Sequence, residues 1–505
     1  MAEIGVIAAG HELSARAGAD ALRAGGNAVD AVIAAMLTAF CCEPLLTGLG
    51  AGGYMLVVSG AGEPVLLDFF VEMPGRGSPP GGAAELVPVE ISFGDAAQVF
   101  NIGPASVGAY GVPAGVAAAS ERFGRMPLGA LTAPAAALAR DGVPLNRPQA
   151  YVVEILADLV TSTPECASLF APGGELLRAG DVLHQPQLAD ALELLGAHGA
   201  APFYTGAPAA AVVDWLGPRG GLLTAEDLSA YRVIDRRPVS VEFRGREILT
   251  NPPPSAGGIL IARALDLVAA AGAGPAPLGT VIEAMRQTQA ARTPEFLAGL
   301  DEPGFGERFL RGGVPGGRLG GTTHVAAIDR DGLACSATCS NGASSGVVVP
   351  GTGIHLNNML GEQDLNPLGF HRYPAGRRLP SMMAPTVARR AGAPELALGS
   401  AGSNRIRSAI LQTILRVLDD GLHAAEAVMA PRVHVEGGVL YTEPGVSLES
   451  VDSHSLAHTA FAGLNLFFGG VQAVQRDLAG RFWGGGDPRR GGAAIVVGDD
   501  DDPTG

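Results

Sequence analysis

Apolar residues recur at helical spacing along residues 14–40, and one break interrupts them at Gly25-Gly26-Asn27. Glycine is typical of the residue just beyond a helix, and asparagine is typical of the residue that caps the next one. We therefore predict two successive helices, the second beginning near Ala28. Glu43-Pro44 marks its end, because proline disrupts a helix interior.

A glycine-rich loop, residues 48–53, follows and leads into an apolar strand at residues 54–59. The loop superficially resembles a phosphate-binding loop. A dinucleotide-binding loop, however, needs a strand before its glycines and a helix after them. Here the helix comes first, so the glycines indicate close backbone packing rather than a nucleotide site.

Residues 112–300 show a succession of helical patterns separated by prolines and glycines. The sharpest break lies at residues 251–258, a rigid turn that opens onto an apolar helix at residues 259–271. No repeat of about 20–50 residues is visible, which argues against a solenoid.

The pattern changes after residues 311–321, a segment with six glycines and one proline that we predict to be mobile and exposed. Residues 322–329 and 333–340 then read as two β-strands. Asp331-Gly332 between them favours a hairpin, because this pair tolerates the positive φ that the turn requires. The glycine-rich segment thus delivers Thr322 to the start of a strand pair.

Thr322 in this position suits an enzyme that cuts its own chain. Its hydroxyl can attack the carbonyl of Gly321, which has no side chain to block the approach. Hydrolysis of the resulting ester frees a threonine whose own α-amine can activate its hydroxyl. Spacing alone leaves a second interpretation open, because a threonine at the start of a strand is also an ordinary β-former.

Composition and charge exclude several classes of protein. The 505 residues are 47% hydrophobic and 17% charged, which is enough for a large core. The net charge is −16 and no basic stripe is visible, so we expect no nucleic-acid partner. No apolar window reaches the roughly 18 residues of a membrane span. The N-terminus also lacks a basic stretch followed by an apolar one, so we expect a cytoplasmic protein with no membrane partner.

The five cysteines do not suggest a disulfide framework, because their number is odd. The adjacent Cys41 and Cys42 lie in an apolar run and are expected to be buried free thiols. Cys335 and Cys339 are four residues apart on a predicted strand, which is poor geometry for a metal site. We expect neither a metal nor a cofactor.

The block Gly321-Thr322-Thr323-His324 is the most specific of an ordered series that resembles the γ-glutamyltranspeptidases, which are N-terminal-nucleophile hydrolases. The other similar blocks are residues 25–31, 43–44, 48–53, 111–115, 203–206, 223–228, 253–258, 350–354, 356–358 and 487–491. The resemblance implies an α+β fold, a four-layer αββα sandwich. It also implies a precursor cut before Thr322 into a large subunit, residues 1–321, and a small subunit, residues 322–505, which form one interlocked domain.

The same resemblance implies roles for individual residues. Thr322 would be the nucleophile, with its freed α-amine as the general base, and Ser340 falls where the family has a hydroxyl that hydrogen-bonds the nucleophile. Residues 399–403 resemble the oxyanion loop. The backbone N–H groups of Gly402 and Ser403 would stabilise the tetrahedral intermediate there, and Ser403 replaces the family's second glycine.

The part of the pattern that recognises the γ-glutamyl group departs from the family. An apolar residue in the block at residues 68–74 replaces the arginine that binds the substrate α-carboxylate, and Arg76 is a candidate substitute. Glu362 keeps an acidic residue about where the family binds the amino group of the substrate. Ser381 keeps one of two hydroxyls, and Asn341 lies one residue before the expected position of an asparagine. The chemistry is thus expected to persist while the substrate stays open.

The leading hypothesis is an amidohydrolase or acyltransferase that cleaves γ-glutamyl amides such as glutathione through an acyl-enzyme, with water or an amine as acceptor. A hydrolase of a different small amide, oxamate- or acylase-like, is the second, and a non-catalytic scaffold protein of the same fold is the third. The expected partners are the small amide, the acceptor and the two subunits of one precursor. A homodimer is left open.

Overall fold

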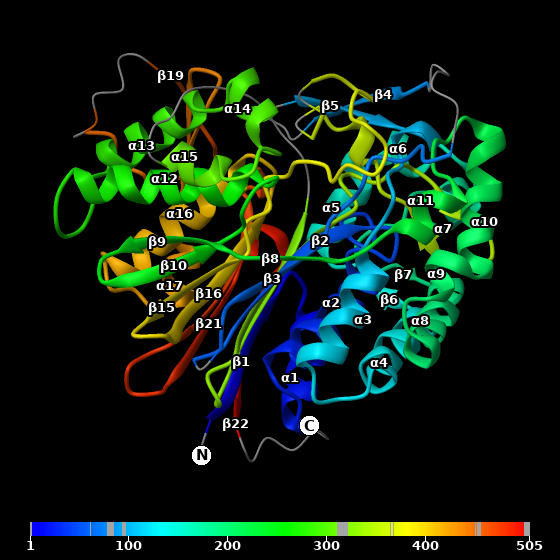
Figure 1. The fold of residues 1–505 in the computed structure, drawn as a ribbon, viewed down its shortest axis with the longest axis horizontal. Coiled ribbons are helices and arrows are strands. Elements are labelled where there is room, and N and C mark those ends of the chain that lie inside the picture. Colours follow the sequence, from blue (N-terminus) through cyan, green and yellow to red (C-terminus); the bar gives the residue numbers. More distant parts are fainter. Residues whose placement is uncertain are drawn as a thin grey trace.

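Two β-sheets packed face to face form the centre of the molecule, and helices cover the outer face of each sheet (Figure 1). The computed structural model describes residues 3–60, 62–77, 85–92, 97–310, 322–363, 365–366, 368–449, 451 and 456–498. The layers follow the order helix, sheet, sheet, helix, so the predicted four-layer αββα sandwich is confirmed.

The first sheet is antiparallel, with the strand order β22-β1-β11-β12-β2-β3-β8. Its strands are β1 (Glu3–Ala9), β2 (Gly52–Val58), β3 (Val65–Phe69), β8 (Ile234–Arg236), β11 (Thr323–Asp329), β12 (Ala334–Ser340) and β22 (Ala493–Gly498). Every residue of β11 and β12 is buried, because this hairpin lies between helices on one face and the second sheet on the other. The predicted hairpin is confirmed, and Gly332 in its turn has a φ of 80°.

The second sheet is also antiparallel, with the order β21-β20-β16-β15-β10-β9. Its strands are β9 (Val239–Phe243), β10 (Arg246–Thr250), β15 (Thr386–Arg390), β16 (Ala393–Ala401), β20 (Gly470–Arg476) and β21 (Phe482–Gly486). β16 and β20 pack on β11 of the first sheet. Each sheet contains strands from before and after Thr322, so both parts of the chain contribute to both sheets.

The helices α1 (Glu12–Arg23) and α2 (Ala28–Cys42) cover the first sheet, and α12 (Ala256–Ala270) and α16 (Arg405–Leu418) cover the second (Figure 1). The predicted break between the first two helices is confirmed. Asn27 caps α2 through a reciprocal pair of hydrogen bonds with Asp30, which satisfies backbone donors that a helix start leaves free. All five cysteines are buried free thiols.

The remaining elements pack around this sandwich. The other helices are α3 (Val112–Phe123), α4 (Leu128–Asp141), α5 (Arg147–Ile155), α6 (Ala157–Val160), α7 (Pro164–Phe170), α8 (Pro186–His198), α9 (Pro202–Thr205), α10 (Ala207–Leu216), α11 (Ala225–Ala230), α13 (Leu278–Ala290), α14 (Pro294–Gly299), α15 (Phe305–Leu310) and α17 (Ala424–Met429). The other strands are β4 (Val87–Ser92), β5 (Ala97–Ile102), β6 (Val143–Pro144), β7 (Val182–Leu183), β13 (Val348–Val349), β14 (Ile354–His355), β17 (Val433–Glu436), β18 (Val439–Thr442) and β19 (Ala457–Ala460). In the part of the chain that the structure describes, no helix has the length and apolarity needed to cross a membrane.

The succession of helices predicted for residues 112–300 is interrupted by strands in two places. The short strands β6 and β7 pair with each other, and β8, β9 and β10 join the two central sheets, where β10 pairs with β15. Val239, Val241 and Phe243 alternate with polar residues, which is the period-two pattern of a half-buried strand. This pattern spans only five residues, and the long helices on either side obscured it.

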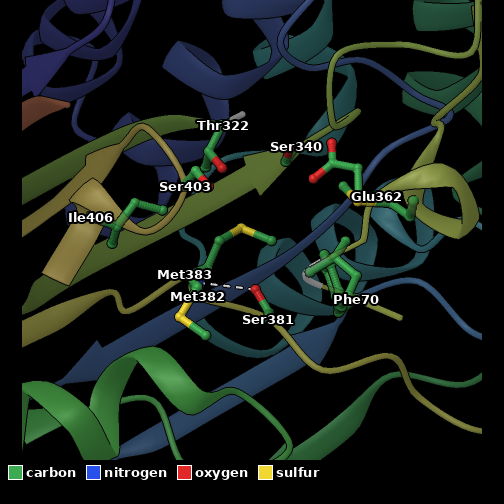
Figure 2. A pocket seen from close by; sticks show the side chains of 11 residues that line it. Phe70, Thr322, Ser340, Glu362, Ser381, Met382, Met383, Ser403 and Ile406 are labelled. Atoms are coloured by element: carbon green, nitrogen blue, oxygen red, sulfur yellow. Dashed lines mark hydrogen bonds between the residues drawn. The ribbon is translucent and has the colours of Figure 1, made fainter. Parts of the chain in front are cut away.

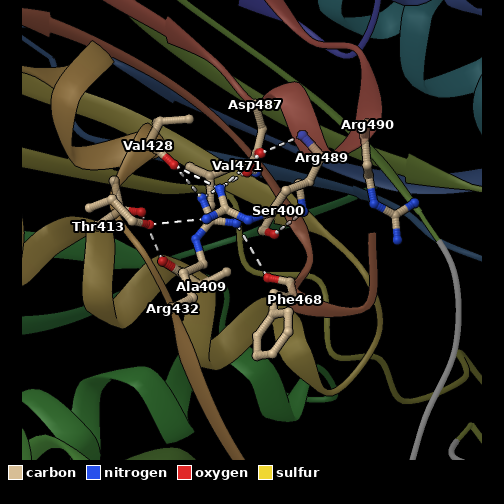
Figure 3. Close-up of polar contacts among 12 residues, drawn as sticks. Ser400, Ala409, Thr413, Val428, Arg432, Phe468, Val471, Asp487, Arg489 and Arg490 are labelled. Atoms are coloured by element: carbon tan, nitrogen blue, oxygen red, sulfur yellow. Dashed lines mark hydrogen bonds and ion pairs between the residues drawn. The ribbon is translucent and has the colours of Figure 1, made fainter. Parts of the chain in front are cut away.

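A buried ionic cluster near the C-terminus holds β20 against its neighbours (Figure 3). Asp487 accepts hydrogen bonds from the Val471 backbone N–H at 2.8 Å and forms ion pairs with Arg432 at 2.7 Å and Arg489 at 3.2 Å. Arg489 also pairs with the buried carboxylate of Glu443. Removing one partner of such a buried cluster would leave the other charges buried without a counter-charge. The intact cluster therefore fixes this corner of the second sheet.

Candidate active site

The register of the central hairpin brings Thr322 opposite Ser340. Thr323, the first residue of β11, pairs with Cys339 of β12, so the residues one step outward face each other across the strands. Both Thr322 and Ser340 are buried. On the far side of β12, Ser340 pairs with Gly52 of β2. A side chain at Gly52 would lie 2.7 Å from the Val71 nitrogen, which confirms that this glycine serves close backbone packing.

A small pocket with a cavity volume of about 20 Å³ opens beside these two hydroxyls (Figure 2). It is lined by Phe70, Thr322, Ser340, Met359, Glu362, Leu365, Ser381, Met382, Met383, Ser403 and Ile406. The structure therefore brings together five residues singled out from the sequence, although they are spread over some eighty positions: Thr322, Ser340, Glu362, Ser381 and Ser403.

The predicted oxyanion loop lies between the end of β16 and the start of α16. Gly402 has a φ of 111° and Ser403 a φ of 64°, so both residues occupy the left-handed region. A side chain at Gly402 would lie 2.7 Å from the Cα of Gly469, so only glycine fits there. Backbone N–H groups at a helix N-terminus favour negative charge, which is what a tetrahedral intermediate develops.

A buried polar chain that the sequence patterns did not reveal supports this loop from behind. Arg292 donates a hydrogen bond to the Asn404 side-chain oxygen at 2.6 Å, and the Asn404 amide donates to Glu436 at 2.8 Å. Burial disfavours the charged form of Glu436, but the contact with His434 and the nearby Arg405 outweigh it and lower the pKa of Glu436 to about 2. These hydrogen bonds fix the side chain of Asn404, the residue that follows Ser403 in the loop.

Glu43 is a second residue whose position near the nucleophile was not anticipated. Its carboxyl group accepts a hydrogen bond from the hydroxyl of Thr323, the neighbour of Thr322, at 3.1 to 3.2 Å. Burial raises the pKa of Glu43 to about 7, against the opposing effects of Thr323 and Arg490. Glu43-Pro44 indicated only a helix end in the sequence, because nothing local reveals which strand the end of α2 packs against.

Burial favours the neutral form of His324. Burial lowers the pKa of His324 to about 3, and its ring nitrogen Nδ1 is 2.8 Å from the hydroxyl of Thr338 on the paired strand. A histidine that stays uncharged and is fixed in this way orients the hairpin. Its burial argues against His324 as a general base.

Phe70 forms the apolar wall of the pocket at the block where the family pattern carries an arginine. Its ring is fully buried and stacks on Tyr54 with 5.4 Å between centroids. Its carbonyl accepts hydrogen bonds from the Tyr231 hydroxyl at 2.7 Å and from Arg378 at 2.5 Å, so the residue is firmly held. Of the lining residues that the structure describes, Glu362 alone is charged.

The structure does not bring Arg76 and Asn341 into the lining of this pocket. The guanidinium of Arg76 forms an ion pair with Glu72 at 2.8 Å, and its backbone N–H donates to Asp227 at 2.9 Å. Arg76 is therefore tied to carboxylates outside the pocket and does not replace the missing arginine. Asn341 is buried beside the pocket lining. Its backbone N–H donates a hydrogen bond to the Leu46 carbonyl, and its own carbonyl accepts one from Asn358. Gly321 and the rest of residues 311–321 lie outside the described residues.

Comparisons with known proteins agree with this geometry. The family model described as "Gamma-glutamyltranspeptidase" matches residues 14–302 and 311–497. The chain belongs to the γ-glutamyltranspeptidase family. The Glutathione hydrolase proenzyme of Escherichia coli (strain K12) is 30% identical over 481 residues, which cover 86% of this chain and 81% of that protein.

Two acylases are also similar to this member of the γ-glutamyltranspeptidase family. The Acylase ACY 1 proenzyme of Pseudomonas sp. (strain V22) is 31% identical over 472 residues, covering 88% of this chain and 84% of the acylase. The crystal structure of cephalosporin acylase from Bacillus halodurans superposes with a TM-score of 0.80 and 26% identity, over 98% of this chain and 96% of that one. The chain is thus a γ-glutamyltransferase-like enzyme with the N-terminal-nucleophile hydrolase fold.

Proposed function

We propose that the protein is made as a precursor, cuts itself between Gly321 and Thr322, and then acts as a threonine-nucleophile amidohydrolase. In the cut, the Thr322 hydroxyl attacks the Gly321 carbonyl, and the acyl group moves from nitrogen to oxygen to form an ester. Water hydrolyses the ester and leaves residues 1–321 with a new carboxylate and residues 322–505 with a free α-amine. Strands from both sides of Thr322 in each sheet would keep the two pieces together.

The mature enzyme would use the freed α-amine of Thr322 as its base. The amine takes the proton of the Thr322 hydroxyl as the oxygen attacks the substrate amide, and it returns a proton to the departing amine. Ser340, opposite Thr322 in the hairpin, would hold the α-amine in place. The N–H groups of Gly402 and Ser403 would stabilise the oxyanion, and water or an amine would then release the acyl group. The observation that carries this proposal is the single pocket shared by Thr322, Ser340 and Ser403.

The first substrate class to consider is the γ-glutamyl amides, including glutathione. The name of the similar Escherichia coli protein, Glutathione hydrolase proenzyme, points to this class. Glu362 faces the pocket and would pair with the substrate amino group, while Ser381 would hydrogen-bond the polar end of the acyl group (Figure 2).

A second candidate is an acylase that cleaves amides of less polar acyl groups. The specific observation in its favour is the wall formed by Phe70, Met359, Met382 and Met383, which offers a substrate carboxylate no cation among the described lining residues. The names of the similar acylases point the same way. A non-catalytic scaffold is disfavoured, because such a protein has no need for the hydroxyls and the strained loop gathered in this pocket. A cytoplasmic location and a homodimer stay predictions.

Intact mass under denaturing conditions tests the proposed function. The wild type, Thr322→Ala and the exposed control Thr205→Ala are purified and incubated for hours. We expect two fragments meeting between residues 321 and 322 in the wild type and the control, and one full-length chain in Thr322→Ala. A wild type that remains one chain and releases amine neither from γ-glutamyl-p-nitroanilide nor from phenylacetyl-p-nitroanilide would refute the proposal.

A further inference from the structure

The side chain of Ser403 has features that its backbone role in the oxyanion loop does not explain. We propose that the Ser403 hydroxyl is a further catalytic group, which donates a hydrogen bond to the substrate oxyanion beside the two backbone N–H groups of the loop. This inference rests on the proposed acyl-enzyme reaction. It concerns a side chain at a position where the family pattern has glycine, which can supply only its backbone N–H.

The first observation is conformational. Ser403 has a φ of 64°, a left-handed conformation that is unfavourable for a residue with a Cβ atom. Glycine adopts this conformation without that cost and would present the same N–H group. The strained backbone therefore favours glycine here, and the presence of serine calls for a separate role of its hydroxyl.

The second observation is a buried donor without a partner. Ser403 is 3% exposed, and its Oγ atom makes no hydrogen bond to any described residue. Leaving a buried hydroxyl unbonded is unfavourable, because burial has removed its hydrogen bonds to water. Neighbouring serines differ: the Oγ of Ser400 donates to the Ala401 carbonyl at 2.7 Å, and the Oγ of Ser381 accepts from the Met383 N–H at 3.0 Å.

The third observation is the location of this hydroxyl. Ser403 lines the same pocket as Thr322, and both side chains are labelled in Figure 2. A carbonyl oxygen held by the backbone N–H groups of Gly402 and Ser403 would lie beside the Ser403 side chain, which branches from the same residue. The missing partner of the hydroxyl is then the substrate oxygen.

The chemistry needs no additional reactant. When the Thr322 oxygen bonds to the carbonyl carbon, one electron pair of the C=O bond moves onto the carbonyl oxygen and gives it a negative charge. The Ser403 O–H donates a hydrogen bond to this oxygen and keeps its proton. When the intermediate collapses, the electron pair returns, the C–N bond breaks, and the amine leaves with a proton from the Thr322 ammonium group. Because the charge is larger in the transition state than in the substrate, the hydrogen bond raises kcat.

Two variants isolate the hydroxyl from the backbone. Ser403→Gly removes the hydroxyl, keeps the N–H and relieves the strained φ, while Ser403→Ala removes the hydroxyl and keeps the Cβ atom. Each is compared with the wild type and with the exposed control Ser229→Ala, after intact mass has established the extent of chain cutting. Acylation is followed in a single turnover of the p-nitroanilide that the wild type cleaves faster.

We expect kcat to fall roughly 10²-fold in both variants, as for the loss of other oxyanion donors, with KM changed less than about threefold. Ser403→Gly should melt at the same temperature as the wild type or higher. A Ser403→Gly variant as active as the wild type would overturn this inference, and so would a loss confined to KM, which would show ground-state recognition only. A wild type that neither cuts itself nor acylates would instead refute the proposed function on which the inference rests.

Discussion

Replacing Glu43 by glutamine tests the most perturbed carboxyl group next to the candidate nucleophile. Glutamine has nearly the shape of a neutral glutamic acid and still offers an oxygen to the Thr323 hydroxyl, which lies 3.1 to 3.2 Å from the carboxylate oxygens. The substitution therefore removes the titration and leaves the contact. Burial raises the pKa of Glu43 from 4.5 to about 7, so the folded protein holds this proton more tightly than the unfolded chain.

The sign and size of the effect follow from this difference. Below pH 4.5 Glu43 is protonated in both states, and the glutamine variant should be as stable as the parent protein. As the pH rises towards 7, the unfolded chain releases the proton first, and the stability of the parent falls. Since one pKa unit corresponds to about 1.4 kcal/mol, the variant should be more stable by about 3 kcal/mol at pH 8.

The assay is urea unfolding at pH 4.5 and pH 8 in a Thr322→Ala background, which keeps the chain in one piece. Glu43→Gln is compared with the exposed control Glu175→Gln. Burial lowers the pKa of His324 to about 3 and of His355 to about 4, which stabilises the fold as the pH rises, so only the difference between variant and parent is informative. If that difference is the same at both pH values, the inferred burial of a neutral Glu43 is wrong.

Two further substitutions test the pocket. Phe70→Arg should raise kcat/KM for γ-glutamyl-p-nitroanilide roughly 10- to 100-fold, because the new guanidinium can form a bidentate pair with the substrate carboxylate. The apolar control Phe70→Leu should not raise it. Equal activity of the two variants would show that Phe70 does not determine specificity. Gly402→Ala should lower kcat at least roughly 100-fold, because the new Cβ would lie 2.7 Å from the Cα of Gly469. The control Gly421→Ala, at an open site with a φ of 72°, should leave kcat unchanged. Retained activity in Gly402→Ala would refute the oxyanion role of this loop.

Several features of this protein could be predicted from short stretches of sequence. The helix break at Asn27, the hairpin turn at Gly332 and the change of pattern before Thr322 all depend on neighbours in the chain. Periods of 3.6 and 2.0 residues and the preferences of glycine, asparagine and proline act over a few positions, so they can be read from the sequence. The four-layer sandwich followed from resemblance to a family rather than from these periods.

The composition of the pocket depended on contacts between distant parts of the chain. Ser381 and Ser403 reach Thr322 only because the two sheets pack face to face, and Glu43 meets Thr323 because α2 packs on β11 of the first sheet. Arg76 seemed a reasonable substitute for the missing arginine until the fold tied it to Glu72.

The sequence by itself therefore determined the local elements and the candidate nucleophile. Only the tertiary structure decided which polar groups are buried together, which of them keep partners, and that Phe70 faces the pocket. The physical reason is that strand register and burial are set by packing over the whole core, where a side chain's charge and hydrogen bonds depend on residues hundreds of positions away.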